Sequence, residues 1–166
     1  MIFTDPFSPA RSPGKRLRDT QRAMSEESAT FDLIELGRAL FEAANRRDFD
    51  AILLGYAPDA VWDMNPLGGL GTFEGHVAIR RFLEDWHSNY EELEIAPEEI
   101  LDLGNGVIFS VVIQKGRPVG SSGDVQQRQA IVVVWVEGLF VRITHYGDID
   151  KGRAAAERLA EERAHG

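Results

Sequence analysis

Three apolar segments in the C-terminal half constrain the fold of this chain more than any other feature. Residues 107–113, 125–136 and 139–146 are rich in β-branched and aromatic side chains, which favour strands. Asn105-Gly106 precedes the first segment, and Asn-Gly is the strongest short-range signal for a hairpin. Glu137-Gly138 separates the second segment from the third. The pattern predicts a meander of long antiparallel strands.

Shorter extended segments precede this meander. Residues 60–65 have the pattern of a strand, and the glycine-rich stretch 67–75 after them predicts a mobile loop. Residues 93–95 and 100–103 also have a strand pattern, with Pro97 interrupting them. The second of these two segments leads directly into the Asn-Gly turn, so we expect it to pair with the first strand of the meander.

Helical spacing of apolar residues occurs at both ends of the domain. The expected helices cover about residues 28–46, 49–57, 75–90 and 152–163. The second should begin after Asp48, bury Tyr56 on its apolar stripe and end before Pro58. Asp148 or Asp150 should cap the last. Helices first and an antiparallel sheet afterwards predict an α+β fold.

Length and charge limit the organisation of the chain. With 166 residues and 43% hydrophobic content, it suits one domain. The formal net charge of −9 argues against a nucleic-acid partner, which requires a basic face. Residues 1–25 hold five basic and two acidic residues, together with three prolines. We therefore expect a flexible basic head over 1–27 and a single α+β domain over 28–166.

No segment resembles a targeting signal or a membrane anchor. The apolar residues near the start are scattered singly, unlike a secretory signal, and no run approaches the ~18 apolar residues of a membrane span. The chain has no cysteine, which excludes disulfides and thiolate chemistry. Cytoplasm is the default expectation. Met24 is an alternative start, so whether residues 1–23 belong to the native protein stays open.

Several short motifs resemble one family, the SnoaL-like polyketide cyclases. They are Val61-Trp-Asp-Met-Asn-Pro66, Gly75-His-Val-Ala-Ile-Arg-Arg-Phe82, Glu137-Gly138 and Tyr146-Gly-Asp148. This family lies within the superfamily of nuclear transport factor two, ketosteroid isomerase and limonene epoxide hydrolase, and the resemblance covers about residues 30–160. It implies a cone-shaped curved antiparallel sheet with helices packed on its concave face around a pocket. It also implies a homodimer that needs no cofactor and takes a small hydrophobic molecule.

The catalytic positions of the superfamily are mostly apolar in this chain. By resemblance, the base and oxyanion hole of ketosteroid isomerases correspond to Asn65, Leu40 and roughly Ile131. The middle-strand pair of limonene epoxide hydrolases falls among apolar residues of 109–113, and their final-strand aspartate corresponds to His145. Only this last position keeps a titratable side chain.

His145 and Asp63 are the candidate catalytic residues. His145 alternates with Ile143, so both should face the pocket, where a neutral imidazole accepts or donates a proton; the alternative is a core histidine satisfied by a neighbour. Asp63 either points inward as a carboxylate with a raised pKa or is solvated at a bulge, and we favour the solvated position. Asn65 either donates to a ligand carbonyl or closes the turn before Pro66.

The expected pocket wall consists of aromatic, aliphatic and polar side chains from several elements. Its members are Asn65, Trp62, Met64, Phe82, Trp86, Phe109, Val111, Trp135 and Ile143. His87 lies beside the inner stripe of its helix, and we favour a solvent-exposed position for it. The histidines lack the spacing of metal ligands, so no metal site is expected.

Three functional hypotheses follow. A binding protein would keep the pocket without catalysis, and the missing acid–base pair slightly favours this hypothesis. An enzyme would use His145 as general acid or base on a hydrophobic carbonyl or epoxide, as an isomerase, cyclase or hydrolase of polyketide- or steroid-like substrates. In the third, Trp and Phe side chains fill the pocket and the sheet serves only for dimer or partner contacts. A structure without a cavity of at least ~300 Å³ near His145 would support this third hypothesis against both ligand hypotheses.

Overall fold

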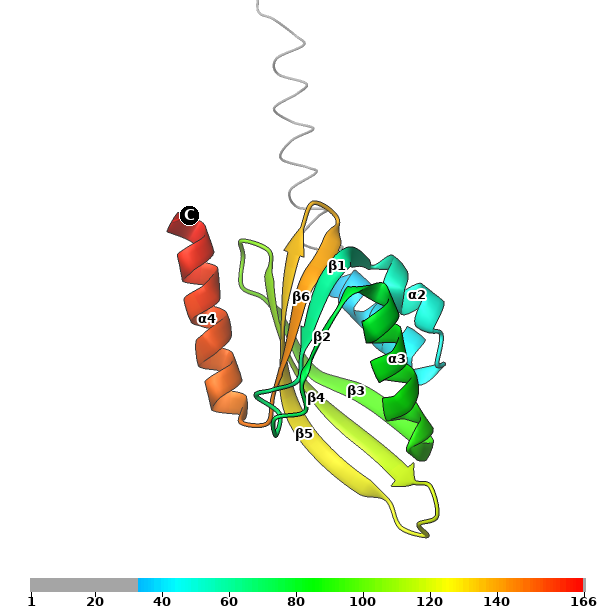
Figure 1. Cartoon of the computed structure of the whole chain (residues 1–166). Helices are drawn as coiled ribbons and strands as arrows, with labels where there is room; N and C mark the ends of the chain where they lie inside the picture. Colours follow the sequence, from blue (N-terminus) through cyan, green and yellow to red (C-terminus); the bar gives the residue numbers. More distant parts are fainter. Residues whose placement is uncertain (1–32, 166) are drawn as a thin grey trace, which may run out of the picture. The chain divides into compact units, whose positions relative to one another are not determined.

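The computed structural model describes residues 33–165, which form one curved six-stranded sheet with helices on both faces (Figure 1). The strand order is β2-β1-β6-β5-β4-β3. The strands are β1 (Tyr56–Asp63), β2 (Thr72–Glu74), β3 (Tyr90–Asp102), β4 (Val107–Pro118), β5 (Val125–Val136) and β6 (Leu139–Tyr146). The helices are residues 33–45, α2 (Phe49–Leu54), α3 (Gly75–Ser88) and α4 (Ile149–His165). The predicted α+β class is confirmed.

The meander from β3 to β6 is antiparallel throughout, and tight turns set its register. Asn105 and Gly106 have φ of 57° and 79°, and Glu137 and Gly138 have φ of 51° and 94°. Two successive positive φ values are the mark of a type I′ turn, whose twist matches that of the strands it joins. By contrast, β1 pairs with β6 in parallel, which the long connection between them permits.

Helices cover the sheet on both faces. The face around which the sheet curves carries α3, which contacts β1, β2 and β3, and α2 packs on α3 and β1 (Figure 1). On the opposite face, α4 packs on β4, β5 and β6 through Ala156 and Ala160. The expectation that helices pack on the concave face therefore holds for α2 and α3 but not for α4.

Two aspartates cap helices as the sequence predicts. The Oδ1 atom of Asp48 accepts a hydrogen bond from the N–H of Ala51 at 3.1 Å, at the start of α2. Asp148, rather than Asp150, caps α4, because its Oδ1 atom accepts from the N–H of Lys151 at 3.1 Å. Each carboxylate satisfies a backbone donor that the first helical turn leaves without a partner.

Three local predictions were wrong around prolines and glycines. Helix α2 ends at Leu54, so Tyr56 begins β1, and Pro58 lies in that strand where its pairing with β6 shifts register. Pro97 bends β3 without interrupting it, because β3 is an edge strand and its pairing also shifts there. The predicted mobile loop contains β2, which pairs with β1.

The predicted basic head, residues 1–27, and the predicted start of the first helix lie outside the described residues. Among residues 33–165, none of the helices combines the length and the apolar character required to cross a lipid bilayer.

Close packing of α4 on the sheet generates a testable prediction at Gly152. A Cβ atom at this position would lie 2.7 Å from the Cβ of Ala130 and 3.2 Å from the Cβ of Tyr146. Overpacking of this kind costs about 1–3 kcal/mol, so we expect Gly152→Ala to lower the free energy of unfolding in urea despite a better helix propensity. Gly37→Ala is the matched control.

Gly37 also lies inside a helix, but a Cβ atom there would have no neighbour within 4 Å. Its replacement should raise the free energy of unfolding by up to about 1 kcal/mol, because alanine favours helix more than glycine does. A Gly152→Ala protein as stable as the wild type would show that α4 does not pack this closely on β5.

Candidate functional site

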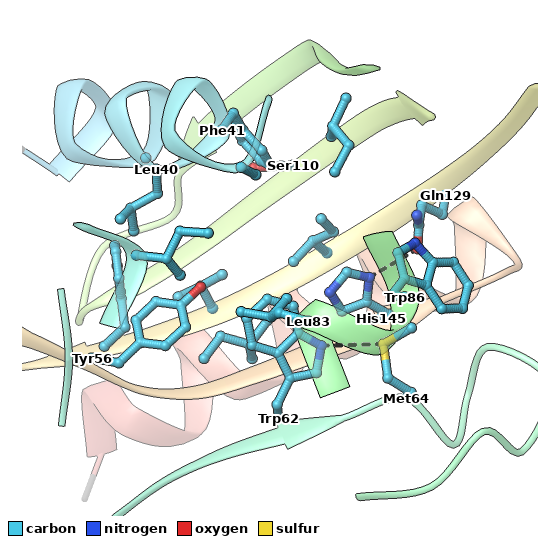
Figure 2. Close-up of a pocket in the computed structure, with 18 of the residues that line it drawn as sticks. Leu40, Phe41, Tyr56, Trp62, Met64, Leu83, Trp86, Ser110, Gln129 and His145 are labelled. Carbon is cyan, nitrogen blue, oxygen red and sulfur yellow. Dashed lines mark hydrogen bonds between the residues drawn. The ribbon is translucent and has the colours of Figure 1, made fainter. Parts of the chain in front are cut away.

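A cavity of about 100 Å³ lies between the sheet and the helices on its concave side (Figure 2). Its lining comes from the first helix, α2, α3 and all the strands except β2, and it is dominated by aliphatic and aromatic side chains. The polar residues among them are Tyr56, His87, Ser110, Gln114, Gln129 and His145. Among the described residues, no aspartate, glutamate, lysine or arginine lines this cavity. The site is therefore a neutral, largely apolar compartment.

The cavity is smaller than the ~300 Å³ at which typical ligand pockets begin. Aromatic side chains account for this. Phe82 stacks on Phe73 with ring centroids 4.4 Å apart and lies 5.9 Å from Trp86 and 6.1 Å from Trp62. The hypothesis that side chains fill most of the pocket is thus supported, although a compact space next to His145 persists.

His145 is held from two sides in this lining. Its Nδ1 atom lies 2.9 Å from Oε1 of Gln129, and its ring stacks on Trp62 with centroids 5.3 Å apart and an interplanar angle of 21°. Figure 2 shows the imidazole of His145 lying between the side chains of Trp62 and Gln129. The other ring nitrogen, Nε2, is buried and has no hydrogen-bond partner among the described residues.

Burial determines the protonation of His145. It lowers the pKa of the imidazole to about 3, because the charged form would lose its hydration without gaining a counter-ion. Gln129 supplies an amide oxygen rather than a carboxylate, so it orients the ring without stabilising a positive charge. His145 is therefore neutral at physiological pH and is a weak base, suited to hydrogen bonding.

His87 is a second buried histidine in the lining, and the prediction that it is solvent-exposed was wrong. It is 2% exposed, its Nδ1 atom lies 2.9 Å from the carbonyl oxygen of Leu83, and its ring packs edge-on against Phe49. Burial lowers the pKa of His87, the Leu83 carbonyl opposes that shift, and the positive charge of Arg47 adds to it. The spacing of four from Leu83 places it on the buried face of α3.

Most indole and amide groups around the cavity already have partners. Nε1 of Trp62 donates to Sδ of Met64 at 3.2 Å, and Nε1 of Trp86 donates to Oε1 of Gln114 at 3.0 Å. Burial raises the pKa of the Tyr56 phenol, so its hydroxyl is neutral. Figure 2 shows this hydroxyl directed into the pocket.

The structure brings together six of the residues singled out in the sequence. These are Trp62, Met64, Phe82, Trp86, Ile143 and His145, and all line the cavity. Leu40 and Ile131, which the resemblance equates with the oxyanion hole of ketosteroid isomerases, also line it as apolar side chains. Leu40, Ile131 and His145 thus bring some of the superfamily positions to this cavity, and none of the three carries an acidic or phenolic group.

Phe109, Val111 and Trp135 do not line the cavity, contrary to prediction. Phe109 and Val111 pack against α4 on the opposite face of the sheet, because alternation along β4 sends their neighbours Ile108 and Ser110 to the cavity. Trp135 follows a register shift after Val134 in the pairing of β5 with β6. In that shift Trp135 pairs with Phe140 and Val141 of β6 has no partner, so the extra residue lies on β6. Trp135 is only partly buried near the end of β5 and is absent from the lining.

Asp63 and Asn65 also lie outside the cavity. Asp63 follows Trp62 on β1 and points away from it, forming an ion pair with Arg142 at 3.0 Å. Its Oδ1 atom accepts from the backbone N–H of Asn65 and from the hydroxyl of Thr72. Asn65 closes the glycine-rich loop through Gly71 and Thr72. Of the alternatives given for Asp63, the inward carboxylate is absent, and the side chain is ion-paired at 15% exposure rather than freely solvated. Of the two roles given for Asn65, the structure has it in the turn and not at the cavity.

The missed polar residues had one weak signal in common. Ser110 is an isolated polar residue in an apolar strand segment, and Gln114 and Gln129 lie where such a segment meets a polar one; an uncharged polar group there usually marks a buried contact. Within residues 33–165, no group of three or more histidine, aspartate or glutamate side chains is placed to hold a metal ion.

The model of the SnoaL-like domain family matches residues 37–145, more than half of the chain. None of the curated proteins matches it. TerC co-crystallised with polyporic acid is 21% identical over 75% of this chain and 97% of that chain, with a TM-score of 0.61.

Two further solved structures have a similar fold. A Catenulispora acidiphila protein with a ketosteroid isomerase-like fold, in complex with trimethylamine, is 13% identical over 74% of this chain and 92% of that chain, with a TM-score of 0.62. A Mycobacterium tuberculosis protein in complex with estradiol-17beta-hemisuccinate is 15% identical over 70% and 94%, with a TM-score of 0.60. At these identities, the likeness establishes the fold alone.

The burial of neutral His145 generates a prediction for stability against pH. In the unfolded chain its pKa returns to about 6.5, so on acidification the unfolded state takes up the proton first. The free energy of unfolding should fall as pH drops from 6.5 towards 3, by up to about 1.4 kcal/mol per pH unit from this residue.

Urea denaturation of the wild type and of His145→Phe between pH 7 and pH 4 measures this effect. The variant should lose less stability over that range, whereas His87 and the carboxylates contribute to both proteins and cancel in the comparison. Parallel losses in the two proteins would contradict a buried, neutral His145.

Proposed function

Because the chain belongs to the SnoaL-like domain family, we propose that it binds a compact, uncharged and mostly apolar small molecule in the cavity beside His145. The observation that carries this proposal is the composition of the lining, to which residues 33–165 contribute no charged side chain. A carboxylate or ammonium group in such a compartment would lose its hydration without a counter-charge, at a cost of several kcal/mol. A neutral molecule avoids this cost.

The size of the cavity sets the size of the ligand. A dry apolar cavity of about 150 Å³ holds benzene, so about 100 Å³ limits the ligand to about the size of benzene or less. Polyporic acid and estradiol-17beta-hemisuccinate, the ligands of two structural neighbours, are much larger. A ligand of that size would require Phe82 and Trp86 to move away from the cavity, which makes a compact ligand the better fit.

An acid–base enzyme acting through His145 is the second candidate. The unpartnered Nε2 atom in the cavity favours it, because a proton-transfer group must face the substrate. The pKa of about 3 weighs against it, since an efficient general base titrates near the working pH. In the part of the chain that the structure describes, no carboxylate lines the cavity to act as a partner. Unchanged turnover and ligand binding in His145→Ala would exclude this enzyme.

The homodimer and the cytoplasmic location implied by the resemblance and composition are further proposals. Analytical ultracentrifugation tests the first, because a dimer has twice the chain mass of 18.5 kDa.

Binding of cyclopentane, followed by NMR chemical shifts of the full chain, tests the proposed function. We expect shift changes at cavity residues and weak affinity, since a ligand of this size gains at most about 1.5 kcal/mol per non-hydrogen atom. Gly37→Leu should abolish them, because Gly37 lines the cavity and has open space around it.

Ala154→Leu is the matched control for this experiment. Ala154 is exposed on α4, across the sheet from the cavity, so the same enlargement there should leave cyclopentane binding unchanged. A wild-type protein that shows no shift changes, or variants that respond alike, would refute a ligand site in this cavity.

A further inference from the structure

The hydrogen bond between His145 and Gln129 determines which nitrogen of the imidazole carries the hydrogen. Gln129 directs Oε1, which is only an acceptor, at Nδ1 of His145 over 2.9 Å, so Nδ1 is the donor. A neutral imidazole has one N–H group, and Nε2 therefore keeps its lone pair. Because burial lowers the pKa of His145 to about 3, this state persists at physiological pH. His145 thus presents a fixed hydrogen-bond acceptor.

Nothing among the described residues donates a hydrogen bond to this acceptor. Nε2 of His145 is buried without a partner, a state that costs about 1–3 kcal/mol in a folded protein. The two indole N–H groups of the lining are already engaged, that of Trp62 with Met64 and that of Trp86 with Gln114. The missing donor is therefore one that an occupant of the cavity can supply.

The hydroxyl of Tyr56 does not discriminate between ligands, because it is neutral and a hydroxyl donates or accepts equally well. Nε2 of His87 is a second buried acceptor of the lining without a partner within residues 33–165, since its Nδ1 atom faces the carbonyl oxygen of Leu83. Both histidines therefore favour a ligand that donates a hydrogen bond, and a variant of His145 separates its contribution from that of His87.

We propose that the ligand carries a neutral O–H or N–H group that donates to Nε2 of His145, as a compact alcohol does, and that the cavity selects against ketones and carboxylates. This inference rests on the proposed binding function. A ketone oxygen at this position would be repelled by Nε2, because both atoms carry lone pairs and neither has a hydrogen to donate. A carboxylate would add the cost of burying a charge in a lining that offers no cation.

Three probes of similar shape separate these contributions. Cyclopentanol has the required donor, cyclopentanone has only an acceptor, and cyclopentane has neither. We expect the full chain to bind cyclopentanol about tenfold more tightly than cyclopentanone in NMR titrations, which corresponds to about 1.4 kcal/mol. Long-range ¹H–¹⁵N correlation of His145 should show the hydrogen on Nδ1 and none on Nε2.

Two variants test whether His145 is the source of this preference. His145→Phe should bind cyclopentanol and cyclopentanone alike while it still binds cyclopentane, because the aromatic ring is kept and the acceptor is lost. Gln129→Glu places a carboxyl group at Nδ1. When the introduced carboxyl group and the imidazole of His145 together hold one further proton, Nε2 of His145 carries a hydrogen. The variant should then bind cyclopentanone more tightly than cyclopentanol.

The outcomes distinguish the two proposals. Equal wild-type affinities for cyclopentanol and cyclopentanone would overturn this inference, and the proposed function would stand as long as cyclopentane binds in the cavity. A hydrogen on Nε2 in the wild type, or a preference for the alcohol that survives in His145→Phe, would also overturn it. If none of the three probes binds, the proposed function fails and this inference fails with it.

Discussion

Burial of the central strands on both faces is the constraint on which the rest of the structure depends. Phe109 on β4 and Ala130 on β5 pack against α4, whereas Ser110 and Gln129, their neighbours along the chain, line the cavity. A shift of one residue in either strand would exchange the two sets and would put the polar side chains under α4. The type I′ turns that fix the register therefore also fix the chemistry of the site.

Burial of the central strands on both faces explains which features of the molecule could be predicted from the sequence. The bounds of β5 and the turn at Asn105-Gly106 were predicted correctly, because strand propensity and turn chemistry are local signals. The face of the sheet on which Phe109 lies was predicted wrongly. Apolar residues occupy both faces of β4, so its sequence has no alternation of apolar and polar residues to indicate the face. The bulge before Trp135 has no local signal at all.

The volume of the cavity depends on side chains more than on the backbone. Successive aromatic contacts link Phe73, Phe82, Trp86 and Tyr90 along the inner side of α3, and Trp62 joins this row from β1. These rings occupy space that a curved sheet of this kind would otherwise enclose. A fold that is shared with proteins crystallised with much larger ligands is therefore compatible with a much smaller site.

Whether His145 can act as a general base or only bind a ligand depends on the side chain that contacts its Nδ1 atom, which is Gln129. A carboxylate at the position of Gln129 would stabilise the imidazolium, raise the pKa of the ring towards neutrality and make it a competent general base. An amide oxygen holds the ring in the same orientation but cannot offset the burial of a charge, so the pKa falls to about 3. The orientation of His145 would thus suit a general base, but with Gln129 beside it the ring stays neutral and its Nε2 atom can only accept a hydrogen bond. His145 is therefore suited to recognising a ligand that donates one.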